Sequence, residues 1–182
     1  MIAVPISKLE KKLTYLIASN GKLPRLDRFM IMISDPYEWL LLTIVLAMSL
    51  IYTDWKTGLI ALLLGGLASA ITDGINTRII KIVTDRIRPG KQYHDIKSLG
   101  AMNSGKKSFP SNHASNTMAF AVAFSLFFPV LTWFMVPLSL LVGYSRIYCG
   151  AHFPLDVIAG WLHGAIWTIL IYSLLNLPAL LQ

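Results

Sequence analysis

Long apolar segments separated by short polar ones dominate this chain, and their lengths predict helices that cross a membrane. Residues 39–53 carry no charge, and a second, mainly apolar segment covers residues 57–81. Residues 108–145 contain no Lys, Arg, Asp or Glu. They are too long for one span of about 20 residues, and Pro129 is the natural point to divide them into two hairpinned helices. With a last uncharged run over residues 157–182, the pattern predicts about five transmembrane helices.

The first 36 residues follow a different pattern, in which four apolar positions recur at helical spacing opposite a lysine-rich face. The apolar positions are Leu9, Leu13, Leu16 and Ile17, and the lysines are Lys8, Lys11 and Lys12. Such a segment is typical of a helix that lies in the membrane interface. We therefore expect an all-α, polytopic membrane helix bundle in a single domain, 1–182, with amphipathic interfacial helices in 1–36 and the transmembrane bundle and its loops in 37–182.

Composition supports a bilayer as the solvent of this chain. Apolar residues make up 55% of the sequence and charged residues 14%, and the mean hydropathy is +0.60. Soluble domains carry about 25% charged residues. The formal net charge of +7 favours contact with anionic lipid. We expect the bilayer and a membrane lipid as partners, with no nucleic acid and no obligate protein partner.

Three polar motifs interrupt the apolar segments, at residues 81–89, 110–113 and 145–156. An even number of predicted crossings separates the loop after the second span from the loop after the fourth, so all three motifs reach the same membrane face. Unpaired charge at membrane depth is costly and therefore usually functional. The motifs combine three cations, two histidines and one carboxylate, which indicates a phosphate site. These residues are Lys81, Arg88, His113, Arg146, His152 and Asp156.

The second motif has the features of an anion-binding helix N-terminus. Ser111 is a good N-cap residue and a long apolar run follows it. The N–H groups of residues 112–114 would then lie at the positive end of a helix, which binds anions. His113, in the first turn, would lie beside the bound anion.

The third motif places His152 and Asp156 four residues apart, with Pro154 suited to the first helical turn. If helical geometry extends back to His152, the carboxylate accepts a proton from one ring nitrogen and leaves the other as a nucleophile. Arg88 and Arg146 can each form bidentate hydrogen bonds with a phosphoryl group, and Lys81 adds a third positive charge.

Taken together, the motifs resemble those of the type 2 phosphatidic acid phosphatases, also called lipid phosphate phosphatases. The family pattern is Lys, six residues, Arg-Pro; then Pro-Ser-Gly-His; then Ser-Arg, five residues, His, three residues, Asp. The matching residues are Lys81, Arg88 and Pro89, then Pro110, Ser111 and His113, then Ser145, Arg146, His152 and Asp156. Asn112 stands where the family has Gly. We expect Asn112 to adopt a positive φ and its side chain to take room near the phosphate.

The resemblance implies a mechanism and a set of roles. His152 would attack phosphorus to form a phosphohistidine, Asp156 would orient its imidazole, and His113 would protonate the leaving oxygen. Lys81, Arg88 and Arg146, with donors at Ser111 and Asn112, would hold the phosphoryl oxygens. No metal and no cofactor are implied.

The resemblance leaves the lipid open, because the motifs do not separate lipid A 1-phosphate from undecaprenyl diphosphate, phosphatidylglycerol phosphate or phosphatidate. The basic N-terminal segment and the polar loop over residues 84–107, which is rich in Arg and Lys, favour a polyanionic headgroup, so lipid A is the preferred substrate. A non-enzymatic protein that binds or transports a lipid phosphate is the alternative class. The histidine pair favours an enzyme, since a binder needs no nucleophile and no acid.

The expected location is a bacterial cytoplasmic (inner) membrane, crossed several times. Of 16 Lys and Arg residues, all but Lys56 lie on the motif-bearing face of the predicted topology. Because the cytoplasmic loops of membrane proteins carry an excess of Lys and Arg, this distribution would make that face cytoplasmic. The family resemblance instead implies a site that faces the periplasm or exterior, and we follow it because some of these charges serve the substrate. Outside the motifs, His163 is expected to be a packed or hydrogen-bonded core residue. Asp73 is either a functional carboxylate or a structural partner, of Arg78 or of another helix in the bundle.

Overall fold

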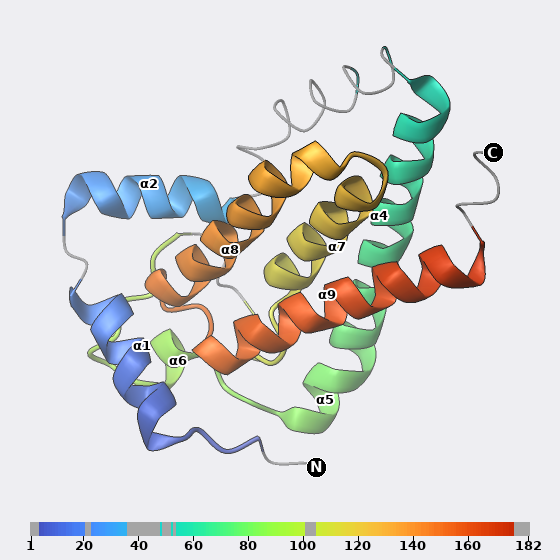
Figure 1. The fold of residues 1–182 in the computed structure, drawn as a ribbon. Helices are drawn as coiled ribbons and strands as arrows, with labels where there is room; N and C mark the ends of the chain where they lie inside the picture. The colour runs from blue at the N-terminus through green and yellow to red at the C-terminus, as the bar shows by residue number, and fades with distance from the viewer. Residues whose placement is uncertain are drawn as a thin grey trace.

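The computed structural model describes residues 4–20, 23–35, 54–100 and 105–176, together with Met48 and Tyr52. Within these ranges the chain is helical apart from its loops and one isolated bridge between Ile87 and Lys107 (Figure 1). The expected span over residues 39–53 lies almost wholly outside the described residues and stays a prediction. The helices are α1 Lys8–Asn20, α2 Pro24–Ser34, α4 Trp55–Ile75, a π-helical turn Asn76–Ile80, α5 Lys81–Thr84, α6 Pro89–Gln92, α7 Asn112–Phe127, a 3-10 turn Pro129–Leu131, α8 Thr132–Tyr148 and α9 Pro154–Leu174.

Three helical stretches of the described chain are long and apolar enough to cross a membrane: Trp55–Thr84, Pro129–Tyr148 and Pro154–Leu174. The first joins α4, the π-helical turn and α5 into one continuous rod, as the sequence predicted. The break at Pro129 between α7 and α8 is also confirmed. With 16 residues, α7 is about 24 Å long, shorter than the roughly 30 Å of a bilayer core. The fold class is confirmed as an all-α, multi-pass membrane bundle.

The shortest of these bundle helices, α7, lies at the centre, in contact with α4, α8 and α9 (Figure 1). Its contact with α9 depends on two glycines of α9, Gly160 and Gly164. A Cβ atom at Gly160 would lie 2.5 Å from the Ser111 carbonyl oxygen, and one at Gly164 would lie 2.1 Å from that of Ser115. Small residues at this spacing let two membrane helices approach closely. The N-terminal ends of α7 and α9, which carry two of the motifs, are therefore held side by side.

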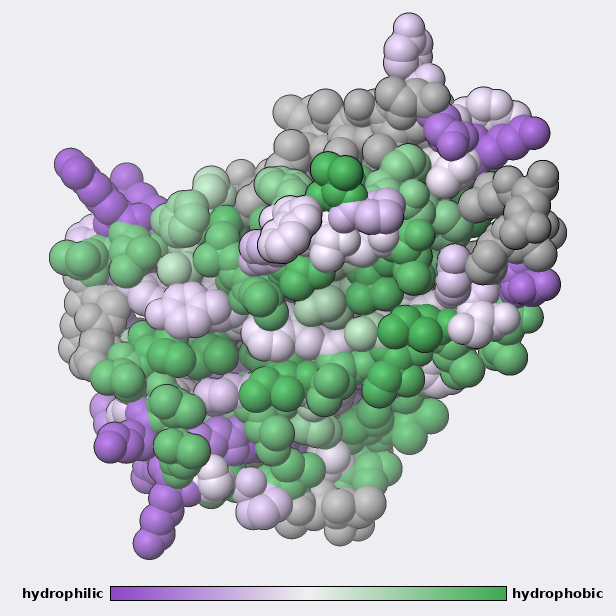
Figure 2. Space-filling model, in the orientation of Figure 1, coloured by the Kyte–Doolittle hydropathy of each residue, from purple (hydrophilic) through white to green (hydrophobic). Residues whose placement is uncertain are grey.

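Apolar side chains cover the centre of the face over α8 and α9, and hydrophilic residues gather towards its ends (Figure 2). The exposed large residues of α9 are Leu155, Ile158, Leu162, Ile166, Ile169, Leu170 and Leu174. A contiguous apolar surface of this kind suits contact with lipid tails rather than water. This apolar surface is the outer side of α9, and the side of α9 that contacts α7 lies opposite.

The two N-terminal helices pack beside the motif-bearing end of the bundle, α1 against α8 and α9 and α2 against α8. Of the four apolar positions of α1, Leu9, Leu13 and Leu16 are exposed, whereas Ile17 packs against the buried core. The buried positions are instead Glu10, Thr14 and Ala18, one helical turn apart. A helix is confirmed here, and it packs on the protein through both polar and apolar side chains; its place in the membrane interface stays a prediction.

Candidate active site

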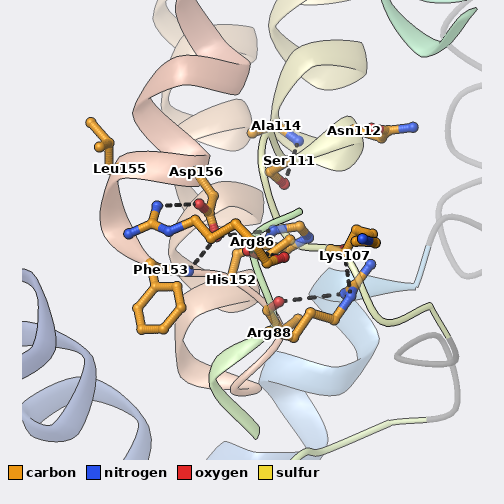
Figure 3. A network of polar contacts seen from close by, with 12 residues as sticks. Arg86, Arg88, Lys107, Ser111, Asn112, Ala114, His152, Phe153, Leu155 and Asp156 are labelled. Carbon is orange, nitrogen blue, oxygen red and sulfur yellow. Dashed lines mark hydrogen bonds and ion pairs between the residues drawn. The ribbon is translucent and has the colours of Figure 1, made fainter. Parts of the chain in front are cut away.

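The first motif leaves the membrane-spanning rod at a sharp turn. Asp85 ends α5 with φ 45°, in the left-handed region. The chain then runs beside residues 106–108, where the Arg88 N–H donates to the Lys106 carbonyl at 3.1 Å and the Ser108 N–H donates to the Arg86 carbonyl at 2.7 Å. The Arg88 Nε donates to the Lys107 carbonyl at 3.1 Å (Figure 3). These hydrogen bonds join the beginning of the polar loop, at residues 86–88, to its end, at residues 106–108, and they fix the position of the Arg88 guanidinium.

The second motif begins α7, as the sequence predicted. Ser111 is the N-cap, and its Oγ accepts a hydrogen bond from the Ala114 N–H at 3.4 Å. The Ser111 N–H donates to the Asp156 carbonyl at 2.9 Å, which ties this cap to the first turn of α9. Because that N–H is already used, the expected contact of Ser111 with phosphate rests on its hydroxyl. His113 is the second residue of α7, and among the described residues its buried Nε2 has no hydrogen-bond partner.

Asn112 lies where its sequence position predicted but in a different conformation. It is the first residue of α7, and the only non-glycine residues with positive φ in the described chain are Asp85 and Asn176. The expectation of a positive φ was therefore wrong, because Asn112 is the first residue of the helix that Ser111 caps and has helical rather than left-handed geometry. The side chain turns towards the rod: Oδ1 accepts a hydrogen bond from Lys81 Nζ at 2.7 Å, and Nδ2 donates to Thr77 Oγ1 at 3.2 Å.

In the third motif a tight turn links α8 to α9 and presents His152. Gly150 has φ 67°, and a Cβ there would lie 2.6 Å from the Lys97 carbonyl oxygen. Glycine is thus required by both conformation and space. The His152 N–H then donates back to the Arg146 carbonyl at 3.2 Å, and the His152 side chain is only 1% exposed. From α8, Arg146 Nη1 donates to the Ser34 carbonyl of α2 at 3.4 Å.

His152 and Asp156 face each other as the four-residue spacing predicted. The distance from His152 Nδ1 to Asp156 Oδ2 is 3.6 Å, slightly longer than a hydrogen bond. Catalytic hydrogen bonds are often long before substrate binds and shorten in the reacting complex. Asp156 is 0% exposed, and its Oδ2 also accepts the Phe153 N–H at 2.8 Å.

Positive charge surrounds the two histidines. Burial lowers the pKa of His152 well below its usual range, and the charges of Arg88, Arg146 and Lys81 lower it further. The imidazole is therefore neutral near pH 7, the form in which a ring nitrogen can attack. The same three cations, with His152, lie close enough to His113 to act on its charge. The structure thus brings together all six charged or ionisable residues singled out from the sequence.

Two residues of this cluster were missed by sequence reasoning. Arg86 donates from Nη1 to Asp156 Oδ1 at 2.5 Å and from Nη2 to Glu10 Oε2 at 2.6 Å (Figure 3 shows the contact with Asp156). Arg86 lies only two residues before Arg88, so its proximity to the site could have been suspected. Glu10 lies in the N-terminal helix, and the sequence distinguishes it only as an acidic residue within a lysine-rich segment.

His163 and Asp73, which lie outside the motifs, have structural hydrogen-bond partners. His163 Nε2 accepts a hydrogen bond from Trp167 Nε1 at 2.8 Å, within α9. Asp73 Oδ1 accepts one from Asn116 Nδ2 at 3.3 Å, which joins α4 to α7. Neither is hydrogen-bonded to His152 in the described part of the chain, although Asp73 lies close enough to Lys81 to act on its charge.

Comparison with known proteins places these motifs in a family. The model of the PAP2 superfamily matches residues 57–178. The chain is 32% identical to the lipid A 1-phosphatase of Rhizobium johnstonii over 106 residues, which is 56% of this chain and 43% of that protein. It is 31% identical to the lipid A 4'-phosphatase of Porphyromonas gingivalis over 176 residues, which is 92% of this chain and 73% of that protein.

A solved structure shares the fold. The crystal structure of Aquifex aeolicus LpxE aligns with a TM-score of 0.68 and 25% sequence identity, covering 93% of this chain and 98% of that one. By contrast, the match to the Rhizobium protein spans less than half of that protein's length.

Proposed function

The chain belongs to the PAP2 superfamily, and from this premise we propose that it is an integral-membrane lipid phosphatase that works through a phosphohistidine on His152. The observation that carries the proposal is the pairing of a buried, neutral His152 with Asp156, at 3.6 Å, within a ring of cations. A phosphate-binding protein would need the cations alone. The nucleophile and its carboxylate partner add chemistry that binding does not require.

In the proposed first step, the ring nitrogen of His152 that faces away from Asp156 attacks phosphorus. The bond from phosphorus to the lipid oxygen breaks, and His113 gives its proton to that oxygen. Lys81, Arg88 and Arg146 stabilise the charge that builds on the phosphoryl oxygens. Asp156 stabilises the imidazolium that forms on His152.

In the second step, water attacks the phosphohistidine, and the neutral His113 accepts the proton of that water. The nitrogen–phosphorus bond breaks, inorganic phosphate leaves, and both histidines return to their starting states. The reaction consumes one water and yields an alcohol and phosphate, so atoms and charge balance. A diphosphate lipid would follow the same steps, with a lipid monophosphate as the leaving group.

Lipid A 1-phosphate is the preferred substrate in this proposal. Two relatives named as lipid A phosphatases support lipid A as the lipid, and the one named for the 1-phosphate supports that position. The polar loop also offers a positive surface to a polyanionic headgroup, with Lys106 exposed. Lys107 contributes less to that surface because it is paired with Asp85. Undecaprenyl diphosphate, phosphatidylglycerol phosphate and phosphatidate are the competing substrates.

The substrate is tested with purified protein in detergent, offered the four lipids separately at low salt while released phosphate is measured. The proposal expects release from all that bind and the highest kcat/KM for lipid A, reduced by Lys106→Gln, since this charge would steer the headgroup. Equal turnover of phosphatidate and lipid A would remove the lipid A preference. Saturable binding of a lipid phosphate without release of phosphate would instead favour a carrier.

We propose a bacterial inner membrane as the location, with the site facing the periplasm. Lys56 at the start of α4 and Lys97 in the polar loop lie at opposite ends of the rod and are both exposed. Single cysteines at these positions can be probed in intact cells, because the native Cys149 is 0% exposed. An impermeant thiol reagent should label Lys97→Cys and spare Lys56→Cys. The reverse pattern would place the site in the cytoplasm.

A further inference from the structure

The N-terminal helix reaches the proposed active site through one buried acidic side chain. Glu10 is 7% exposed, and its Oε2 accepts a hydrogen bond from Arg86 Nη2 at 2.6 Å. Its Oε1 accepts the Leu155 N–H in the first turn of α9 at 3.2 Å. Glu10 therefore uses both carboxylate oxygens inside the protein, on groups that adjoin Asp156.

Arg86 bridges this glutamate to the proposed catalytic carboxylate. It is 4% exposed, and its Nη1 donates to Asp156 Oδ1 at 2.5 Å. The guanidinium also lies over the Phe153 ring, 4.6 Å from its centroid, and the Phe153 N–H holds the other oxygen of Asp156. The carboxylate of Asp156 is thus held at both oxygens, Oδ1 by Arg86 and Oδ2, the oxygen that faces His152, by the Phe153 N–H.

The charges of this arrangement explain why a second acid is present. A buried carboxylate needs a counter-charge, because leaving it unpaired is strongly unfavourable. Arg86 supplies one, but an exclusive pair between Arg86 and Asp156 would be neutral overall and would offer less negative charge to His152. Sharing Arg86 between two carboxylates leaves one net negative charge on the Glu10, Arg86 and Asp156 set. That charge is available to the imidazolium that forms when His152 attacks.

We propose that Glu10 and Arg86 are positioning residues for the reaction: they aim Asp156 at Nδ1 of His152 and keep it ionised without neutralising it. The inference rests on the proposed function, in which His152 is the nucleophile. It makes the membrane-interface helix α1 a functional part of the site, because the carboxylate of Glu10 comes from that helix. Neither residue touches the phosphoryl group in this proposal.

The test compares purified full-length variants with an activated aryl phosphate, whose leaving group needs no proton. Glu10→Gln keeps the shape of the side chain and removes its charge, and Arg86→Gln removes the opposite charge. Thr14→Val is the matched control, since Thr14 is buried on the same face of α1 and hydrogen-bonds the Glu10 carbonyl without contacting Arg86. Wild-type turnover and its loss in His152→Ala report separately on the proposed function.

Two results are expected. Glu10→Gln lowers kcat by about tenfold with little change in KM, whereas Thr14→Val keeps the wild-type kcat. The acidic limb of kcat/KM, which reports protonation of His152, moves to lower pH in Glu10→Gln and to higher pH in Arg86→Gln, because one variant removes negative and the other positive charge. The other charged or ionisable groups that face His152 are unchanged in these variants, namely Lys81, Arg88, His113, Arg146 and Asp156.

A double-mutant cycle keeps the proposal testable if Arg86→Gln does not fold. Because Glu10 is proposed to act through Asp156, Glu10→Gln should cost nothing further in an Asp156→Asn background. An undiminished loss in that background would overturn the proposal, as would an active wild type in which Glu10→Gln and Thr14→Val behave alike. An inactive wild type would instead count against the proposed function.

Discussion

Lys81 Nζ donates a hydrogen bond to Oδ1 of Asn112 at 2.7 Å, and this contact joins the end of the α4–α5 rod to the first turn of α7. Asn112 occupies the position at which the phosphatase motif has glycine, so the contact depends on the residue in which this chain departs from the pattern. It holds a proposed phosphate-binding cation beside the helix N-terminus. The departure therefore has a structural role that a glycine could not fill.

The first prediction follows from that contact. Asn112→Gly should loosen Lys81 and lower kcat/KM severalfold, mainly through KM, because a freely moving ammonium loses more entropy when it binds phosphate. Asn112→Asp should do more harm, since its charge would pair with Lys81 and repel the substrate. Steady-state kinetics measures both. Thr77→Val is the control, because it removes the other partner of the Asn112 amide and leaves Lys81 untouched; an effect as large as that of Asn112→Gly would contradict the explanation.

The second prediction concerns the close contact of α7 and α9. Gly164→Ala places a methyl group where 2.1 Å separates it from the Ser115 carbonyl oxygen, so the helices must move apart. We expect a loss of stability of about 1–3 kcal/mol, typical of overpacking, seen as a lower unfolding temperature in detergent. Gly66→Ala in α4 is the matched control, with nothing within 4 Å of the added Cβ. It should be neutral or slightly stabilising. Similar destabilisation in both variants would argue against the proposed contact.

The third prediction addresses the absence of a metal from the proposed mechanism. Phosphate release should continue at its full rate in a chelator, because histidine and the three cations supply the nucleophile and the charge stabilisation. Vanadate should inhibit, since it can adopt the trigonal-bipyramidal shape of the transition state. Activity lost in EDTA and restored by magnesium would show that the proposed chemistry is incomplete.

The fourth prediction separates the roles of the two histidines. General acid catalysis typically supplies about a hundredfold to ten-thousandfold, and a good leaving group does not need it. An activated aryl phosphate should therefore restore much of the activity of His113→Ala and none of that of His152→Ala. Comparable recovery in the two variants would mean that the roles are wrongly assigned.

The sequence predicted those features of this protein that local physics decides. Ser111 begins α7 because its side chain caps the helix, and Pro129 divides the uncharged stretch because it cannot continue one. The four-residue spacing of His152 and Asp156 likewise placed them face to face. In each case the signal and its consequence lie within one helical turn.

Contacts between distant segments were beyond the sequence pattern. Nothing around Glu10 indicates that it meets Arg86, 76 residues along the chain, since the lysines beside it predict only a solvated or membrane-bound face. The side-chain partners of Asn112 were equally unpredictable, because Lys81 and Thr77 lie on another helical segment. Tertiary packing decides both.

The central claim, a phosphohistidine on His152, is tested most directly by trapping it. Protein mixed with a lipid phosphate labelled in its phosphate group is quenched in alkali, in which phosphohistidine survives, and the labelled peptide is identified. We expect label on His152 in the wild type, none in His152→Ala, and more in His113→Ala supplied with a labelled aryl phosphate, because that variant forms the intermediate but hydrolyses it slowly. Phosphate release by His152→Ala at the wild-type rate, or label on another residue, would contradict it.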